Sequence, residues 1–219
     1  MTWLLLATGF TGALTLLYLV RIAYHHFHAL PSVTAHFSPK GGCTDVIVRE
    51  VQRARHEVLV LAYSFTSRPI AQALIDAKLR GVQVDIVLDP SNERDAYSDL
   101  HFFLEQGLPP LIDPHHAIAH NKVMVIDGRT VLTGSFNFTH HAETENAENL
   151  LVLTGHPDLV RAYRQDFAAH KAHARAPQVA VAPAQHPADG THPGGHAGDG
   201  EPMTIKIDPA QHTGSRHAA

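Results

Sequence analysis

The sequence predicts an α/β fold in which a mixed, mainly parallel β-sheet is flanked by helices. Between residues 36 and 171, short apolar runs typical of buried strands alternate with segments whose apolar residues recur at helical spacing. Such alternation of strand and helix implies crossover connections between parallel strands. A segment of about 130 to 150 residues is also long enough to bury a sizeable core. The central part of the chain is therefore predicted to be one domain.

Local patterns predict the individual elements of this domain. Residues 44–56 carry apolar residues with charges between them, which suits a helix, and residues 58–62 form a short apolar run typical of a buried strand. Residues 69–80 favour a helix because Pro69 lies in its first turn and Gly81 lies just past its end. An alternating strand over 82–88 and helices over 96–106 and 158–170 complete the prediction.

The N-terminal segment is an apolar run. Residues 2–20 contain no charged side chain, and 19 helical residues would span roughly 28 Å, enough for a hydrocarbon core of about 30 Å. We predict an uncleaved membrane anchor over residues 1–24 and a linker over 25–35. Arg21 after the span is a weak indication of a cytoplasmic domain, and a periplasmic face stays open. The alternative is a cleaved signal peptide, which would make the protein secreted or periplasmic.

The C-terminal segment, residues 172–219, differs in composition from the domain. It is rich in Ala, Pro, Gly and His and has no sustained hydrophobic period, so it cannot offset the entropy of ordering. We predict a disordered tail. Its six histidines could bind metal adventitiously, but a solvated tail is the favoured interpretation.

Charge and cysteine content exclude some classes of site. The formal net charge is −4, and residues 36–170 hold 12 Lys and Arg against 17 Asp and Glu, which gives −5. Because phosphate neutralisation supplies most nonspecific nucleic-acid affinity, binding to a polyanion would have to come from a local groove. Cys43 is the single cysteine, which excludes an intramolecular disulfide and a cysteine-rich zinc site.

A predicted hairpin carries the candidate chemistry. Asp127-Gly128 between two apolar runs is a strong turn signal, since both positions tolerate positive φ. Side chains alternate along a strand, so His120 and Lys122 share a face. A two-residue or a four-residue loop would gather them with Ser135 and Asn137 on one surface, whereas a three-residue loop would split the set.

The combined motifs resemble the phospholipase D superfamily. His120-x-Lys122-x4-Asp127, followed by Gly134-Ser135-x-Asn137, resembles that family's signature, and the likeness covers roughly residues 36–170. Small single-motif bacterial nucleases are the most similar branch, as indicated by segments 37–39, 61–67, 81–84, 134–139 and 145–150. The resemblance is specific for the superfamily and much less so for the substrate.

The resemblance implies a two-step displacement without a metal ion or other cofactor. His120 of one subunit would attack phosphorus, and His120 of the other would protonate the leaving oxygen. Lys122, Asn137 and Ser135 would hold the phosphate oxygens. Glu148 matches the family's downstream acid and would orient an imidazole. Asp127, like Gly134, is assigned a structural role at the site.

Because this mechanism needs two histidines and the chain has one such motif, a homodimer is expected to form the active site. His115, His116, His140 and His141 match no motif position and are expected on the surface or at the rim. A nonspecific endonuclease acting on DNA or RNA is the first functional hypothesis. The alternatives are a membrane-associated phospholipase D or cardiolipin hydrolase, and a non-catalytic nucleic-acid-binding module. The zinc finger of some cardiolipin-hydrolase relatives would require more cysteines than Cys43.

Overall fold

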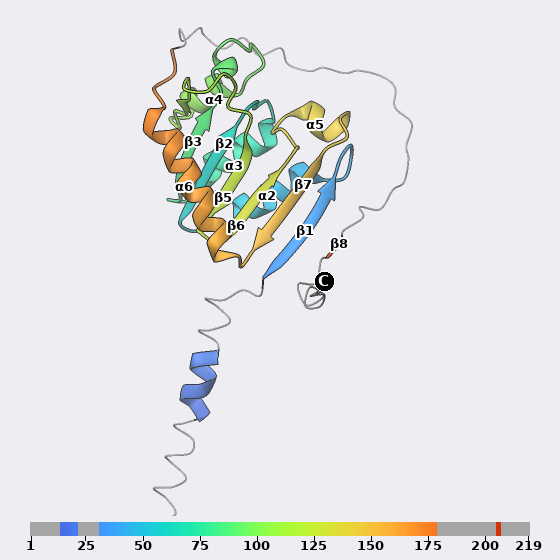
Figure 1. The fold of residues 1–219 in the computed structure, drawn as a ribbon, viewed down its shortest axis with the longest axis vertical. Coiled ribbons are helices and arrows are strands. Elements are labelled where there is room, and N and C mark those ends of the chain that lie inside the picture. The colour runs from blue at the N-terminus through green and yellow to red at the C-terminus, as the bar shows by residue number, and fades with distance from the viewer. Residues whose placement is uncertain (1–13, 22–30, 179–204, 207–219) are drawn as a thin grey trace, which may run out of the picture.

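The computed structural model describes residues 14–21, 31–178 and 205–206. Its centre is an eight-stranded sheet with the order β4-β3-β2-β5-β6-β7-β1-β8 (Figure 1). The elements are β1 (Ser32–Phe37), α2 (Cys43–Arg53), β2 (Glu57–Ala62), α3 (Arg68–Leu79), β3 (Gln83–Leu88), the 3-10 helix η1 (Pro90–Glu93), α4 (Leu100–Glu105), β4 (Leu111–Ile112), β5 (Lys122–Ile126), β6 (Thr130–Gly134), α5 (His140–Thr144), β7 (Asn149–Thr154), α6 (Pro157–His173) and β8 (Ile205–Lys206). Five predicted elements are found as α2, β2, α3, β3 and α6, with bounds that differ by up to three residues.

The prediction of a mainly parallel sheet was wrong. Only β2–β3 and β3–β4 pair in parallel, whereas β2–β5, β5–β6, β6–β7, β1–β7 and β1–β8 are antiparallel. The strand-helix-strand order over residues 57–88 does give a parallel pair. The β5–β6 hairpin and strands β7 and β1, two strands that the sequence patterns did not reveal, add the antiparallel majority.

Two helical layers cover the sheet unequally. Helices α2 and α3 pack on one face, where Val60, Met124 and Leu132 are fully buried. Helix α6 lies across β2, β5 and β6 on the other face and buries Val125 and Val131 (Figure 1). Each strand of the hairpin therefore has apolar residues on both sides, which explains why its sequence lacks strict alternation.

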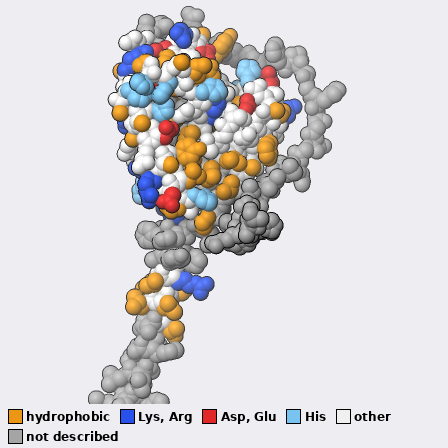
Figure 2. Space-filling model, in the orientation of Figure 1, with side chains coloured by type: hydrophobic (Ala, Val, Ile, Leu, Met, Phe, Trp, Pro, Cys, Tyr) orange, Lys and Arg blue, Asp and Glu red, His pale blue; other side chains and the backbone are white. Residues whose placement is uncertain are grey.

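Part of the α6 side of the sheet is not covered by α6. The side chains of Val33, Leu151 and Leu153 are only partly buried there, and Phe37 is 46% exposed. Figure 2 shows hydrophobic side chains gathered beside α6, over β6, β7 and β1. We call Val33, Phe37, Leu151 and Leu153 the half-covered face.

The helix predicted over residues 96–106 is shorter than expected, because α4 begins only at Leu100. The preceding residues form a turn instead: the Tyr97 N–H donates to Asp95 Oδ1 and the Ser98 hydroxyl donates to Asn92 Oδ1. Side chains that bond to nearby backbone compete with helix in this way. The Asn92 contact depends on the tertiary fold, so local sequence could not show it.

The predicted terminal segments lie largely outside the described residues. Residues 14–21 are helical, and across the described ranges the chain contains no helix with the length and apolar character needed to span a bilayer. At the other end, α6 continues past Lys171 to His173, and Arg175 pairs with Ile112 and forms an ion pair with Glu93 at 2.8 Å. The ordered domain therefore includes the first residues that the sequence assigned to the tail; residues 179–204 and 207–219 are outside the described part.

Candidate active site

The β5–β6 hairpin has a three-residue loop, which is the case in which strand register splits the candidate residues. Ile126 pairs with Thr130, and Asp127 and Gly128 have φ values of 51° and 59°, as the turn signal predicted. The Asp127 N–H donates to the Glu57 carbonyl, which ties the turn to β2. That contact with a distant strand was invisible in the local sequence. Cross-strand register therefore does not bring the candidate residues together.

Strand ends bring them together instead. Antiparallel neighbours β5, β6 and β7 place the start of β5, the end of β6 and the start of β7 at one edge of the sheet. His120 precedes β5, Ser135 and Asn137 follow β6, and Glu148 precedes β7. The pairing of Lys122 with Ala62 adds the end of β2 to the same edge. We call this edge the motif end of the sheet.

His120 and Lys122 flank the ring of Tyr63. The His120 ring centroid lies 4.5 Å from that of Tyr63, and Lys122 Nζ lies 5.0 Å from the Tyr63 centroid. Lys122 Nζ also donates to the His120 carbonyl at 2.9 Å. His120 itself is exposed, whereas Lys122 is buried. An accessible imidazole thus stands beside a cation that is shielded from water.

The pKa of Lys122 is shifted by its surroundings. Burial lowers the pKa of Lys122, and the nearby negative charge of Glu148 opposes that shift. The two groups therefore interact electrostatically at the motif end. An ammonium with little water around it binds an anion more strongly than an exposed one, because the local dielectric is lower.

Two buried polar residues after β3 hold the segments that carry His120 and Tyr63. Asp89 Oδ2 accepts from the Ala119 N–H at 2.8 Å, one residue before His120. Asn92 Nδ2 donates to the Tyr63 carbonyl at 2.7 Å. Sequence reasoning assigned no role to Tyr63, Asp89 or Asn92. For Asp89, the available signal was a polar residue directly after a predicted buried strand.

Glu148 is positioned by Ser38, which follows β1. The Ser38 N–H donates to the Glu148 carbonyl at 3.1 Å, and the Glu148 N–H donates to the Ser38 hydroxyl oxygen at 3.2 Å. The Ser38 hydroxyl in turn donates to the Asn146 carbonyl, and Asn146 Nδ2 donates to Glu148 Oε1 at 3.2 Å. This closed set of bonds fixes the short segment that carries the carboxylate.

Ser135 and Asn137 lie beyond a break in the β6–β7 ladder. The N–H groups of Ser135 and Phe136 both donate to the Asn149 carbonyl at 3.1 Å, which interrupts the regular alternation of faces. Ser135 Oγ accepts from the Asn149 N–H at 3.0 Å. Asn137 Oδ1 is buried and has no hydrogen-bond partner in the described residues. A buried amide oxygen without a partner lowers the stability of the fold, which indicates that the side chain has a functional role.

Gly134 is required by close backbone approach at this break. A Cβ at this position would lie 2.3 Å from the Asn149 carbonyl oxygen, and the φ of Gly134 is 154°. No side chain fits without moving β7. The structure thus gives a physical reason for the structural role predicted for Gly134.

Asp127 is structural, but it does not lie at the site. It sits at the opposite end of β5 from His120, roughly 20 Å away at the rise of a strand. Its carboxylate accepts from the N–H groups of Arg55, His56 and Glu57. The predicted location was therefore wrong, because sequence spacing alone did not show that the strand separates the two ends of the motif.

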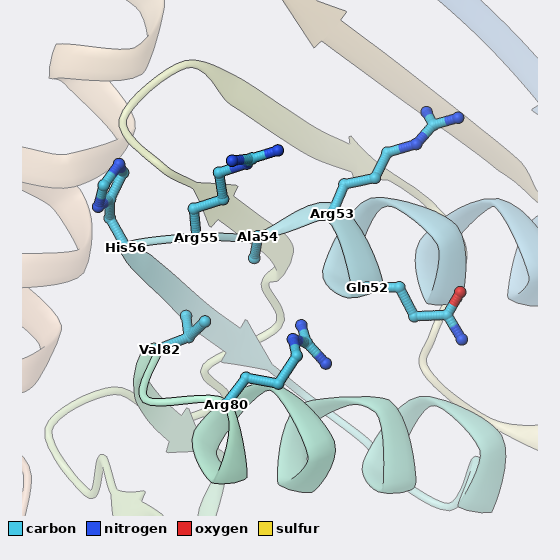
Figure 3. A pocket seen from close by; sticks show the side chains of 7 residues that line it. All are labelled: Gln52, Arg53, Ala54, Arg55, His56, Arg80 and Val82. Atoms are coloured by element: carbon cyan, nitrogen blue, oxygen red, sulfur yellow. The ribbon is translucent and has the colours of Figure 1, made fainter.

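A basic depression of about 680 Å³ also lies at the Asp127 end of the sheet. Arg53, Arg55 and Arg80 line it together with His56 (Figure 3). One guanidinium nitrogen of Arg80 already donates a hydrogen bond to the Val51 carbonyl at 3.0 Å. None of the motif-end residues lines this depression, so it does not contribute to a phosphate site around His120.

One side-chain group within the described ranges has the composition of a metal site. Asp113, His116, His170 and His173 each offer a ligand atom, and these atoms lie within 4.8 Å of one another. Sequence reasoning predicted no metal ligands and expected His116 at the surface or rim. The spacing His170-x-x-His173 on α6 was the missed signal, because residues three apart share a helix face.

Comparisons with known proteins agree with this architecture. Residues 47–171 match the family described as "Cardiolipin synthase, PLD-like domain". A protein named Phospholipase D from Rickettsia bellii is 42% identical over 140 residues, which cover 64% of this chain and 69% of the relative. A mitochondrial cardiolipin hydrolase from Chlamydomonas reinhardtii is 33% identical over 49% of this chain and 48% of its own length.

Among solved structures, a phospholipase D family member, Nuc, from Salmonella typhimurium is similar with a TM-score of 0.65 and 35% identity. The match covers 67% of this chain and 98% of the Salmonella protein. NucT from Helicobacter pylori, at 21% identity and a TM-score of 0.62, shares the fold. The chain therefore belongs to the phospholipase D superfamily and is a phosphodiesterase of that superfamily.

Proposed function

We propose that this protein hydrolyses phosphodiester bonds in nucleic acid by a metal-independent, two-step displacement at His120. The observation that carries the proposal is the pairing of an exposed imidazole with the buried Lys122 at the motif end, with Glu148 close enough to act on the charge of Lys122. A nucleophile must be reachable by substrate, while an anion-binding cation gains strength from shielding. His120 and Lys122 meet these two requirements.

In the first step, a ring nitrogen of His120 attacks phosphorus, and the bond from phosphorus to the leaving oxygen breaks. The leaving oxygen takes a proton from the imidazolium of His120 of the partner subunit. In the second step, that neutral imidazole removes a proton from water, whose oxygen attacks phosphorus and breaks the phosphorus–nitrogen bond. Both histidines then return to their starting protonation states.

Lys122, Ser135 and Asn137 would stabilise the phosphate oxygens. Negative charge builds on these oxygens in the transition state, so donors fixed in advance lower the barrier. Asn137 would act through its side-chain NH2 group, which is the donor of the amide, and Ser135 through its hydroxyl, whose oxygen accepts from the Asn149 N–H. Glu148, fixed by Ser38, would orient an imidazole and favour its reactive tautomer.

A homodimer would complete the site, since the sequence carries one copy of the motif. The half-covered face supports this proposal, because its partly exposed apolar side chains reach the motif end through Phe37, which pairs with Asn149. Contiguous apolar surface beside a functional site is typical of an interface. A second copy packed there by two-fold symmetry would bring two motif ends close together.

Nucleic acid is the first substrate candidate because the sequence resembles small single-motif bacterial nucleases and because the exposed His120 is open to a polymer backbone. Phospholipid is the second candidate. Two observations favour it: the Rickettsia relatives are named Phospholipase D, and Ile118, two residues before His120, is 58% exposed. An exposed apolar side chain beside the nucleophile suits contact with lipid. The predicted anchor over residues 1–24 stays a prediction and would place such a site at a membrane.

One substrate panel tests both candidates. Purified dimer is incubated in EDTA with supercoiled plasmid, single-stranded nucleic acid and cardiolipin liposomes. We expect nicking and degradation of nucleic acid by the wild type and loss of at least about a thousandfold in His120→Ala or Lys122→Ala. His141→Ala, an exposed α5 histidine outside the motif, is the matched control and should retain activity. Release of phosphatidic acid without nucleic-acid cleavage would replace the first candidate by the second. A folded wild type inactive on all three would contradict both and favour a binding module.

A further inference from the structure

Four metal-binding side chains from two distant segments converge beside the C-terminal end of α6. Asp113 and His116 lie between β4 and β5, and His170 and His173 lie in the last turns of α6. Their ligand atoms all lie within 4.8 Å of one another. Figure 2 shows histidine side chains gathered on this part of the surface. The group is separate from the motif end and takes no part in the proposed displacement.

The centre of the cluster is Asp113, which is completely buried. Its Oδ2 lies 2.5 Å from His170 Nδ1, and its Oδ1 lies 2.8 Å from His173 Nδ1. The His116 ring centroid is 5.0 Å from that of His170 and 5.6 Å from that of His173. One carboxylate and three imidazoles therefore surround a common point.

Hydrogen bonding alone does not account for this arrangement. His173 Nδ1 is buried, and despite its proximity to Asp113 it makes no hydrogen bond of acceptable geometry within the described residues. A fully buried carboxylate beside a buried ring nitrogen that makes no hydrogen bond fits a bound cation.

We propose that Asp113, His116, His170 and His173 bind one divalent transition-metal ion of the zinc class. Three nitrogen ligands and one carboxylate oxygen in a four-coordinate set are typical of Zn²⁺. Ca²⁺ and Mg²⁺ prefer six or more oxygen ligands, which this set does not offer. Small movements of the rings would reach ligand distances of about 2.0 to 2.2 Å.

The bound ion would fasten α6 to the segment that leads into the active site. His116 is four residues before His120, and the Asn121 side chain lies 3.2 Å from His170 Nε2. The metal would therefore limit the motion of the chain on both sides of the nucleophile. The ion would stabilise the fold, whereas hydrolysis of the phosphodiester does not need the ion and continues when a chelator is present. Metal removal thus affects unfolding much more than cleavage.

The test measures Zn²⁺ affinity of the full-length chain by competition with a chromophoric chelator, and coordination by the visible spectrum with Co²⁺. Because the tail contains histidines, the measurements use a full-length background in which His186, His192, His196, His212 and His217 are replaced by alanine. We expect one ion per chain, a tetrahedral Co²⁺ spectrum, and a higher unfolding temperature with Zn²⁺.

His116→Ala and His173→Ala should each weaken Zn²⁺ binding at least about tenfold and abolish the tetrahedral spectrum. His116 is exposed, so its replacement leaves the fold intact. His115→Ala is the matched control, because it removes the adjacent exposed histidine without changing the ligand set, and affinity should be retained. His120→Ala should also bind Zn²⁺ normally, which separates this inference from the proposed function. The proposal would be overturned if the background protein bound Zn²⁺ no more tightly than the His116→Ala/His173→Ala double variant. Equal losses of Zn²⁺ affinity in His115→Ala and His116→Ala would also overturn it.

Discussion

Replacing Asp127 by alanine should destabilise the protein without impairing catalysis. The carboxylate accepts hydrogen bonds from three consecutive backbone N–H groups, those of Arg55, His56 and Glu57, at distances between 2.7 and 3.2 Å. At a partly exposed position each bond contributes about 1 kcal/mol, which is below the range of about 1.5 to 3 kcal/mol for hydrogen bonds to charged groups. Alanine at the φ of 51° adds about 1 kcal/mol more. The expected loss is therefore about 4 kcal/mol.

Asparagine should be tolerated better at this position. It accepts positive φ and keeps one acceptor oxygen, so Asp127→Asn should cost about 2 kcal/mol. Unfolding in urea, followed by circular dichroism, measures both variants. Asp158→Ala is the control, because Asp158 is almost fully exposed and, within the described residues, its ion pair is with Arg161 of α6. Loss of that pair and of the negative charge in the first turn of α6 should together cost less than about 1 kcal/mol.

The activity of Asp127→Ala tests whether Asp127 lies far from the reacting atoms. Under conditions in which Asp127→Ala is folded, its kcat should remain within about twofold of the wild type, since roughly 20 Å of strand separates Asp127 from His120. A stability loss below about 1 kcal/mol would contradict the role of Asp127 in fixing the turn. A fall in kcat of more than about tenfold in the folded variant would contradict its distance from the reaction.

Four further predictions concern the motif end. Gly134→Ala should lose about 3 kcal/mol or more of stability and most activity, because its Cβ would meet the Asn149 carbonyl oxygen; normal stability by urea denaturation would contradict this contact. Ser38→Ala should cost about 2 kcal/mol and lower kcat more than it raises KM, because Glu148 loses its support; an unchanged kcat would argue against that role. Burial lowers the pKa of Lys122, so its ammonium form is present below that lowered pKa and is lost as pH rises through it; kcat/KM should fall on the alkaline side at a lower pH than an ordinary lysine would give. In Glu148→Gln the opposing charge is gone, so the alkaline limb of the residual activity should move to still lower pH, and a shift in the opposite direction would contradict the interaction.

Local sequence patterns predicted those elements whose apolar periodicity is strong. The helices α2, α3 and α6 and the strands β2 and β3 follow directly from such patterns. Strand β7 was missed although residues 150–153 form a short apolar run like that of β2. Its pairing with β1, more than a hundred positions away, could not be predicted from local patterns. Pairing sense is likewise a property of the whole sheet, which explains why the predicted parallel majority was wrong.

The candidate site was recognised by its residue types, while the stated geometric reason for it was incorrect. An even hairpin loop would have aligned His120 and Lys122 with Ser135 and Asn137, but the loop has three residues. The residues share an end of the sheet because β5, β6 and β7 are antiparallel neighbours. The supporting bonds from Asp89, Asn92 and Ser38 cross between distant segments, so no spacing rule could have found them.

The proposed metal site of Asp113, His116, His170 and His173 likewise depends on contacts that local sequence does not predict. Asp113 and His170 are 57 positions apart, and their contact arises only because α6 returns across the sheet to β4. Only the spacing of His170 and His173 on one helix face was readable in advance. Contacts of this kind are set by topology, and the sequence predicts them only when the topology is already known.

The stereochemical course at phosphorus shows whether the reaction passes through a covalent intermediate on His120. A phosphodiester substrate that the panel shows to be cleaved is prepared as a single phosphorothioate stereoisomer and hydrolysed in ¹⁸O-labelled water with chelator present. Two successive in-line displacements, first by His120 and then by water, each invert the configuration, so net retention is expected. Net inversion would mean that water attacks directly in one step, and it would contradict the role assigned to His120.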